Sequence, residues 1–112
     1  MQTDIIYLKS SESMSEVDDE SVDLIVTSPP YNIDIKYGNK TEKGKVMASK
    51  AIKYSDKMTE SAYRELLRSV FEECKRVLKK NGSIWINIKN RYINGEIITP
   101  FWLQEYFEGF TL

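Results

Sequence analysis

One long amphipathic segment between two strand-like segments constrains the fold of this sequence more than any other feature. In residues 59–80, apolar side chains recur at three- and four-residue spacing, which predicts a helix with a single apolar face. Residues 21–27 form an apolar run before it, and isoleucines alternate with other residues in 83–90 after it. This order predicts an α/β fold with a mostly parallel sheet, its strands buried under helices on both faces.

The ends of the long segment carry helix-capping signals. Thr59 is a suitable N-cap, and Asn81-Gly82 predicts a left-handed stop after residue 80. A basic cluster in the last turns suits the negative end of the helix dipole, an explanation that we favour over nucleic-acid contact; it comprises Lys75, Arg76, Lys79 and Lys80. Cys74 falls on the apolar face, so we expect a packed thiol there.

Weaker patterns surround this unit. Residues 4–9 predict a first strand, and the acidic residues 10–20 a short helix. Thr99-Pro100 opens a further helix that Gly109 should end. Residues 110–112 resemble the start of another strand, so we expect a fragment or an unusually short member of its class.

Composition narrows the possible classes of protein. The 112 residues, 41% hydrophobic and 29% charged, fit one small globular domain. The sequence has no membrane-spanning run and no signal-peptide pattern, so we expect a cytoplasmic protein. One cysteine cannot form an internal disulfide, and a chain without histidine lacks the usual zinc ligand sets and every histidine-based triad, so we expect no metal site.

The basic residues are concentrated in one part of the chain. Residues 32–58 hold seven lysines against three acids and show no clear periodicity, which predicts a long, Lys-rich, mobile loop. Such a loop suits a polyanionic partner, although a solvated loop explains it equally well. Residues 89–91, just after a predicted strand, have two interpretations as well: they contact DNA, or they are a polar strand exit.

The most distinctive motif is Thr-Ser-Pro-Pro-Tyr at residues 27–31, directly after the apolar run. In α/β sheets, ligands bind at the carboxyl ends of strands. The prolines stiffen the loop and remove N–H donors, so Ser28 and the Ser28 or Pro29 carbonyl could accept both hydrogens of an exocyclic amine. Tyr31 offers a face on which an extruded base could stack. A stiff turn with a packing tyrosine is the plainer alternative.

The motif and the residues around it resemble a known family. Ser28-Pro29-Pro30-Tyr31, the strand-like residues 21–27 and the run at residues 76–86 are similar to the DNA amino-methyltransferases that act on cytosine N4 or adenine N6. The resemblance implies part of a Rossmann-like, S-adenosylmethionine-dependent methyltransferase sheet. It also implies methyl transfer from that cofactor to the exocyclic amine of a flipped base in double-stranded DNA.

Carried over by position, the resemblance makes Ser28, Pro29, Pro30 and Tyr31 the catalytic residues. The amine binds Ser28 and the Pro29 carbonyl, and the base stacks on Tyr31. Serine at the first motif position favours cytosine N4 over adenine N6.

The motif lies near the amino end, as in the permuted class, whose cofactor loop Phe-x-Gly-x-Gly comes later; the sequence has no such loop. We therefore expect residues 1–112 to be a catalytic half, with the cofactor-binding half absent. A cognate restriction endonuclease is a candidate partner. The alternative function is a non-catalytic nucleic-acid-binding remnant of this fold.

Overall fold

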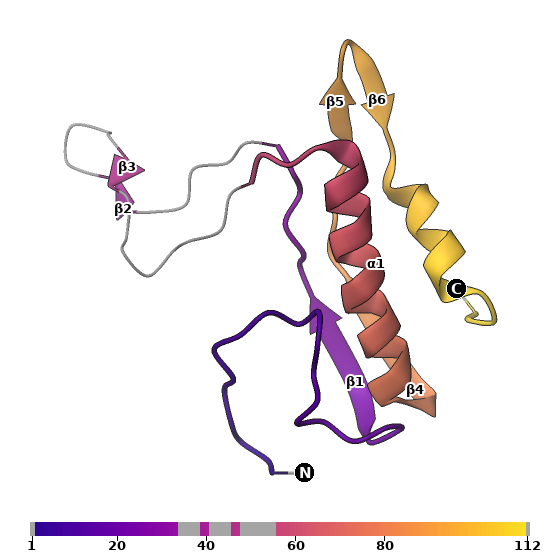
Figure 1. The fold of residues 1–112 in the computed structure, drawn as a ribbon. Coiled ribbons are helices and arrows are strands. Elements are labelled where there is room, and N and C mark those ends of the chain that lie inside the picture. The colour runs from indigo at the N-terminus through magenta and orange to yellow at the C-terminus, as the bar shows by residue number, and fades with distance from the viewer. Residues whose placement is uncertain (1, 34–38, 41–45, 48–55, 112) are drawn as a thin grey trace.

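The computed structural model describes residues 2–33, 39–40, 46–47 and 56–111. It is a mixed α/β structure in which one helix lies beside a pair of parallel strands (Figure 1), as the sequence predicts. In chain order the elements are β1 (Val22–Thr27), β2 (Asn39–Lys40), β3 (Val46–Met47), α1 (Glu60–Val77), β4 (Leu78–Ile86), β5 (Arg91–Ile93), β6 (Glu96–Ile98) and the 3₁₀ helix η1 (Pro100–Phe107).

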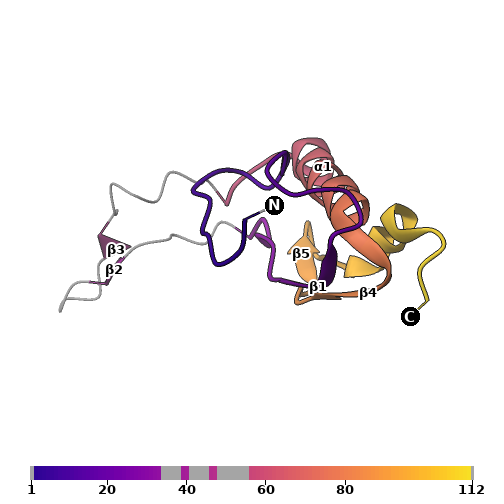
Figure 2. The ribbon, with the colours of Figure 1, turned by 90° about the horizontal axis from the view of Figure 1, so that it is seen from below.

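The central unit is β1–α1–β4. β1 and β4 pair in parallel, with Ile25 opposite Ile84 and Thr27 opposite Ile86. α1 covers one face of this pair (Figure 2), and the three isoleucines pack against its buried side chains. The parallel pairing that the strand–helix–strand order predicts is therefore confirmed.

The other face of the β1–β4 pair is bare among the described residues (Figure 2). Leu24, Val26 and Trp85 are 55%, 73% and 69% exposed on these strands. The prediction that helices bury both faces is therefore wrong for this part of the chain. η1 packs against α1.

The core lies between α1, the inner face of the sheet and η1. Its buried side chains are Tyr63, Leu67, Phe71, Cys74 and Leu103. Aromatic pairs join the two helices: Tyr63 meets Trp102 edge-on at 6.1 Å between ring centroids, and Phe71 lies 5.1 Å from Phe107. Burial raises the pKa of the Cys74 thiol to about 11, with a smaller effect from the charge of Glu73, so the packed thiol is confirmed.

α1 begins as its sequence predicts and ends earlier. Thr59 caps it, because its hydroxyl accepts from the backbone N–H of Ala62 at 3.2 Å. Leu78 is already extended and continues directly into β4, so the stop predicted at Asn81-Gly82 is wrong. The register of β4 shifts here: Val22 pairs with Leu78, but Leu24 pairs with Ser83. The residues between form a bulge, in which Gly82 approaches β1 closely.

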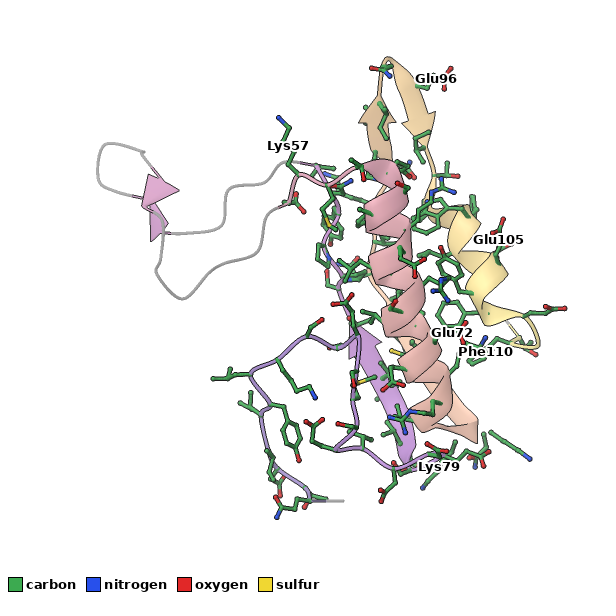
Figure 3. The ribbon with its side chains drawn as sticks, viewed as in Figure 1. Lys57, Glu72, Lys79, Glu96, Glu105 and Phe110 are labelled. Carbon is green, nitrogen blue, oxygen red and sulfur yellow. The ribbon has the colours of Figure 1, made fainter. Side chains whose placement is uncertain are left out.

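The basic cluster at the end of α1 is engaged in ion pairs. Arg76 bonds to Asp19 and Glu73 and donates to the backbone carbonyls of Met14 and Val17. Lys79 pairs with Asp23. Figure 3 shows Lys79 and Lys57 at opposite ends of α1. These contacts favour the structural explanation of the cluster.

The amino-terminal segment differs from its prediction. Residues 4–9 form no strand, and Ile6 and Leu8 are 87% and 98% exposed. Residues 10–20 form turns and bends in place of a short helix. A strand requires a neighbouring backbone for its hydrogen bonds, and in the described residues β1 and β4 pair only with each other.

The carboxyl-terminal segment contains one element that the sequence analysis missed. β5 and β6 form an antiparallel hairpin around Asn94 and Gly95, both at positive φ, as a tight hairpin turn requires. η1 then starts after Thr99, and Gly109, at φ +88°, follows its end as predicted. Residues 110 and 111 form no strand, and residue 112 lies outside the described residues.

Residues 32–58 were predicted to be a loop. β2 and β3 form a short antiparallel pair within them, so the prediction is wrong at those four residues. The structure does not describe residues 34–38, 41–45 and 48–55. The loop predicted there lies outside the described residues. No helix in the described part of the chain has the length and apolar character needed to cross a membrane.

Candidate active site at the carboxyl ends of β1 and β4

The Ser-Pro-Pro-Tyr motif directly follows β1, at the sheet edge where the sequence analysis expects a ligand site. Ser28 is exposed, Pro29 is buried, and Pro30 and Tyr31 are half-buried. The two hydroxyl groups that flank the prolines meet: Ser28 Oγ lies 3.0 Å from the phenolic oxygen of Tyr31. The motif therefore presents its serine to solvent on a bend anchored by a buried proline.

Asn87 completes a cluster with these two hydroxyls. Its Nδ2 lies 3.2 Å from the Tyr31 oxygen and 3.5 Å from Ser28 Oγ. The sequence analysis did not single out this residue. A signal was available, because Asn87 directly follows β4 and the carboxyl ends of parallel strands meet at one edge of a sheet.

Two of the four backbone carbonyls from Thr27 to Pro30 are already occupied. The Thr27 carbonyl accepts from the backbone N–H of Asn87 at 2.9 Å, and the Pro30 carbonyl accepts from the Tyr63 hydroxyl at 2.6 Å. Among the described residues, no hydrogen bond occupies the Ser28 and Pro29 carbonyls, so both keep their acceptor capacity. These are the two carbonyls that the sequence analysis names as candidate acceptors.

A second set of side chains holds Tyr63 in place. The Arg91 guanidinium lies over the Tyr63 ring, 4.7 Å from its centroid, and donates two hydrogen bonds to Glu60 at 2.7 and 2.8 Å. These bonds lower the pKa of Glu60 to about 2, against the opposing effect of burial. Arg91 is only 4% exposed, so the reading that it faces DNA is wrong. Lys89 and Asn90 are exposed.

A third set of bonds fixes the chain just after the motif. Both carboxylate oxygens of Asp56 accept backbone N–H bonds, from Asn32 at 3.0 Å and from Ile33 at 2.9 Å. The Asn32 side chain bonds to both backbone groups of Met58. Asn32 has φ +58°, a conformation that asparagine tolerates better than most residues. The two ends of the Lys-rich segment are thereby held together beside the motif.

A hollow of about 470 Å³ opens beside this clamp. Its walls come from residues 32–33, 56–58 and 89–93, so it lies between the exit of β4 and the residues that follow Tyr31. Lys57 and Lys89 both line it. The edge of the sheet therefore combines a bend rich in acceptors with a neighbouring hollow that carries two lysines.

Comparison with known proteins identifies the family. A family model described as DNA methylase matches residues 22–111. The chain is 30% identical over 94 residues to the type II methyltransferase M.HpaI of Haemophilus parainfluenzae, an alignment that covers 84% of the chain and 26% of that protein. It is 33% identical to M.SfiI of Streptomyces fimbriatus, over 79% of the chain and 18% of that protein.

A third relative is the type II methyltransferase M.SmaI of Serratia marcescens, which is 33% identical over 81% of the chain and 27% of its own length. The chain thus spans about a quarter or less of the length of these curated relatives. Because the family model covers most of the chain, including β1, the motif and β4, the chain belongs to the DNA methylase family.

Proposed function

We propose that the chain is the catalytic part of a DNA amino-methyltransferase. The enzyme transfers a methyl group from S-adenosylmethionine to the exocyclic amine of a flipped base, with cytosine N4 favoured and adenine N6 next. One observation carries the proposal: Thr27 and Pro30 have their carbonyls engaged, which leaves the Ser28 and Pro29 carbonyls beside the exposed Ser28 hydroxyl. These acceptors lie together on one stiff bend.

This bend suits an aromatic amine because such an amine is a poor nucleophile while its lone pair is delocalised into the ring. Ser28 Oγ and the Pro29 carbonyl accept the two amine hydrogens and draw the nitrogen toward tetrahedral geometry. The lone pair then points away from the bend. Tyr31 stacks against the base and fixes its plane. Catalysis by this chain is thus orientation and hydrogen bonding, without a side-chain nucleophile.

The described residues do not fit a site for the methyl donor. Two carboxylates that the structure describes after the motif are engaged: Asp56 accepts from two backbone N–H groups, and Glu60 pairs with Arg91 and Arg64. No glycine-rich turn follows β1 or β4, whose next residues are Ser-Pro-Pro-Tyr and Asn-Ile-Lys-Asn. We therefore assign donor binding to residues other than those described, and residues 1–112 to the catalytic half of the domain.

Double-stranded DNA is the proposed partner, in the cytoplasm. Lys57 and Lys89, at the hollow beside the motif, are suited to contact backbone phosphates next to the flipped nucleotide. A cognate restriction endonuclease is a proposed partner in the cell, since the relatives named above are type II methyltransferases.

Replacement of the motif serine tests the chemical role. In the full-length product of the reading frame, Ser28→Ala should lower kcat by about 10²-fold, as expected for loss of one preorganised hydrogen-bonding group. DNA affinity should change far less. Ser83→Ala, an exposed serine within β4, is the matched control. Equal losses in kcat and DNA affinity would contradict the assigned role.

Calorimetry tests whether residues 1–112 bind the methyl donor by themselves. S-adenosylmethionine should produce heat of binding with the full-length product and none with residues 1–112. If neither protein binds the cofactor but DNA binding persists, the chain belongs to a non-catalytic nucleic-acid-binding remnant.

A further inference from the structure

Three polar groups from two separate parts of the chain meet at the exposed edge of the sheet. Ser28 and Tyr31 flank the two prolines after β1, whereas Asn87 follows β4, 59 residues beyond Ser28. The distances are 3.0 Å between the two hydroxyl oxygens, and 3.2 and 3.5 Å from Asn87 Nδ2 to Tyr31 and Ser28. Asn87 is the member that the proposed chemistry does not yet use.

The position of Asn87 is set by the sheet. Thr27 pairs with Ile86, and the backbone N–H of Asn87 donates to the Thr27 carbonyl at 2.9 Å, which continues the ladder by one bond. Asn87 is therefore held beside Ser28, its neighbour at the end of β1. Its side chain reaches the two hydroxyls from a backbone that the sheet fixes.

The chemistry of the three groups makes Asn87 a fixed donor. The Nδ2 group has two hydrogens to donate and accepts none, whereas each hydroxyl can donate or accept. Both hydroxyl oxygens lie within reach of this one amide. The hydroxyl end of the Tyr31 ring is therefore held toward Ser28, and the angle between the ring and the serine is fixed before any ligand arrives.

We propose that Asn87 is a positioning residue that holds the Tyr31 ring and the Ser28 hydroxyl in the relative geometry that a flipped base requires. The inference rests on the proposed function: the base stacks on a ring whose tilt Asn87 sets, so that the exocyclic amine reaches Ser28. Asn87 acts through its two neighbours and does not itself touch the reacting atoms.

Kinetics of the full-length product test this role. Asn87→Ala should lower kcat for methyl transfer to double-stranded DNA by about 10- to 100-fold, with less than about a threefold change in KM for DNA. Asn87→Gln, which keeps the amide on a longer side chain, should recover part of the loss. Asn81→Ala removes an exposed asparagine in the bulge of β4, away from the cluster, and should leave kcat unchanged.

A double-mutant cycle separates positioning from a merely structural effect. If Asn87 acts through the Tyr31 hydroxyl, Asn87→Ala should cost much less kcat in a Tyr31→Phe background than alone. Fully additive losses, or an unchanged kcat in Asn87→Ala when the unaltered protein is active, would overturn the proposal. The urea midpoint of Asn87→Ala should stay close to that of the unaltered protein, because the side chain is exposed.

A measurement independent of activity distinguishes this inference from the proposed function. In the full-length product labelled with ¹⁵N-asparagine, the side-chain amide resonances of Asn87, assigned from their loss in Asn87→Ala, should shift in Tyr31→Phe. Unchanged resonances would overturn the cluster itself. A shift combined with no methyl transfer by the unaltered full-length product would overturn the proposed function and, with it, the catalytic purpose of the cluster.

Discussion

The Tyr63 hydroxyl donates a 2.6 Å hydrogen bond to the Pro30 carbonyl across 33 residues of sequence. Tyr63 is fully buried in α1, and Pro30 lies on the bend after β1. The bond ties the motif to the core, so the rigidity of the bend comes from the helix as well as from its two prolines.

Tyr63→Phe tests this tie. The substitution leaves the half-buried Pro30 carbonyl without its donor, which should lower the free energy of unfolding by about 1–3 kcal/mol. Urea denaturation of residues 1–112 measures the change. Tyr92→Phe is the matched control, because Tyr92 is 75% exposed. Equal stabilities of the Tyr63→Phe variant and the unaltered chain would contradict a structural role for the bond.

Low pH should destabilise the fold by protonating Glu60, which bonds to the Arg91 guanidinium that lies over the Tyr63 ring. The hydrogen bonds from Arg91 lower the pKa of Glu60 in the folded chain to about 2, below its ordinary value of 4.5. A carboxyl whose pKa is lower in the folded chain than in the unfolded chain stabilises the fold at pH values above its unfolded-state pKa. This contribution is lost as pH falls from about 4.5 to about 2. Glu73, whose pKa is also lowered to about 2 by Arg76, loses its contribution in the same window.

The measurement is urea denaturation at pH 7, 4.5, 3 and 2. The free energy of unfolding should fall in the last two steps, from pH 4.5 to 3 and from pH 3 to 2, and Glu60→Gln should flatten part of this dependence. Glu96→Gln, at an exposed carboxylate of the β5–β6 hairpin (Figure 3), should leave it unchanged. An identical pH profile for Glu60→Gln and the unaltered chain would refute the assignment.

Cys74 should be inert in the folded protein. It is 5% exposed, and burial raises its pKa to about 11, so the reactive thiolate is scarce at pH 8. Ellman's reagent should react with the thiol slowly in buffer and fully after urea denaturation. Rapid reaction in buffer would place the thiol outside the core.

Gly82→Ala should destabilise the β4 bulge. A Cβ at this position would lie 2.7 Å from Leu78 Cδ1 and 3.0 Å from the Asp23 carbonyl oxygen, so the strand or the buried leucine must move. Overpacking of this kind costs about 1–3 kcal/mol. Thermal denaturation against the control Ser83→Ala measures the effect, and a melting temperature equal to that of the control would argue against the close approach.

The parts of the fold set by periodicity could be predicted from the sequence. Apolar spacing placed α1 and its Thr59 cap, and the strand–helix–strand order gave the parallel β1–β4 pair with the motif at its carboxyl edge. These features follow from local sequence patterns, and the elements that they predict pack against one another within the described residues.

Other features depend on which neighbour a segment finds. The apolar Ile6 and Leu8 suggest a strand, but they have no strand partner in the described chain. Asn81-Gly82 carries a helix-stop signal, yet its glycine instead permits close contact within the sheet. Asn94-Gly95 is a hairpin signal, since both residues adopt the positive φ that a tight turn requires.

In the candidate site, too, some residues could be predicted from the sequence and others could not. The Ser-Pro-Pro-Tyr motif was visible in the sequence, whereas Asn87, Tyr63 and Arg91 join it only through tertiary packing. Asn87 alone could have been anticipated, from the register of two parallel strands.

The outward position of Trp85 gives the chain an optical consequence. Its indole is 69% exposed beside Val26, whereas the other tryptophan, Trp102, is half-buried against Arg64 and Tyr63. Emission from Trp85 should therefore resemble that of indole in water and respond readily to soluble quenchers. A polypeptide that packs over this face of the sheet would shift the Trp85 emission to the blue. The fluorescence of Trp85 therefore reports whether this face is covered.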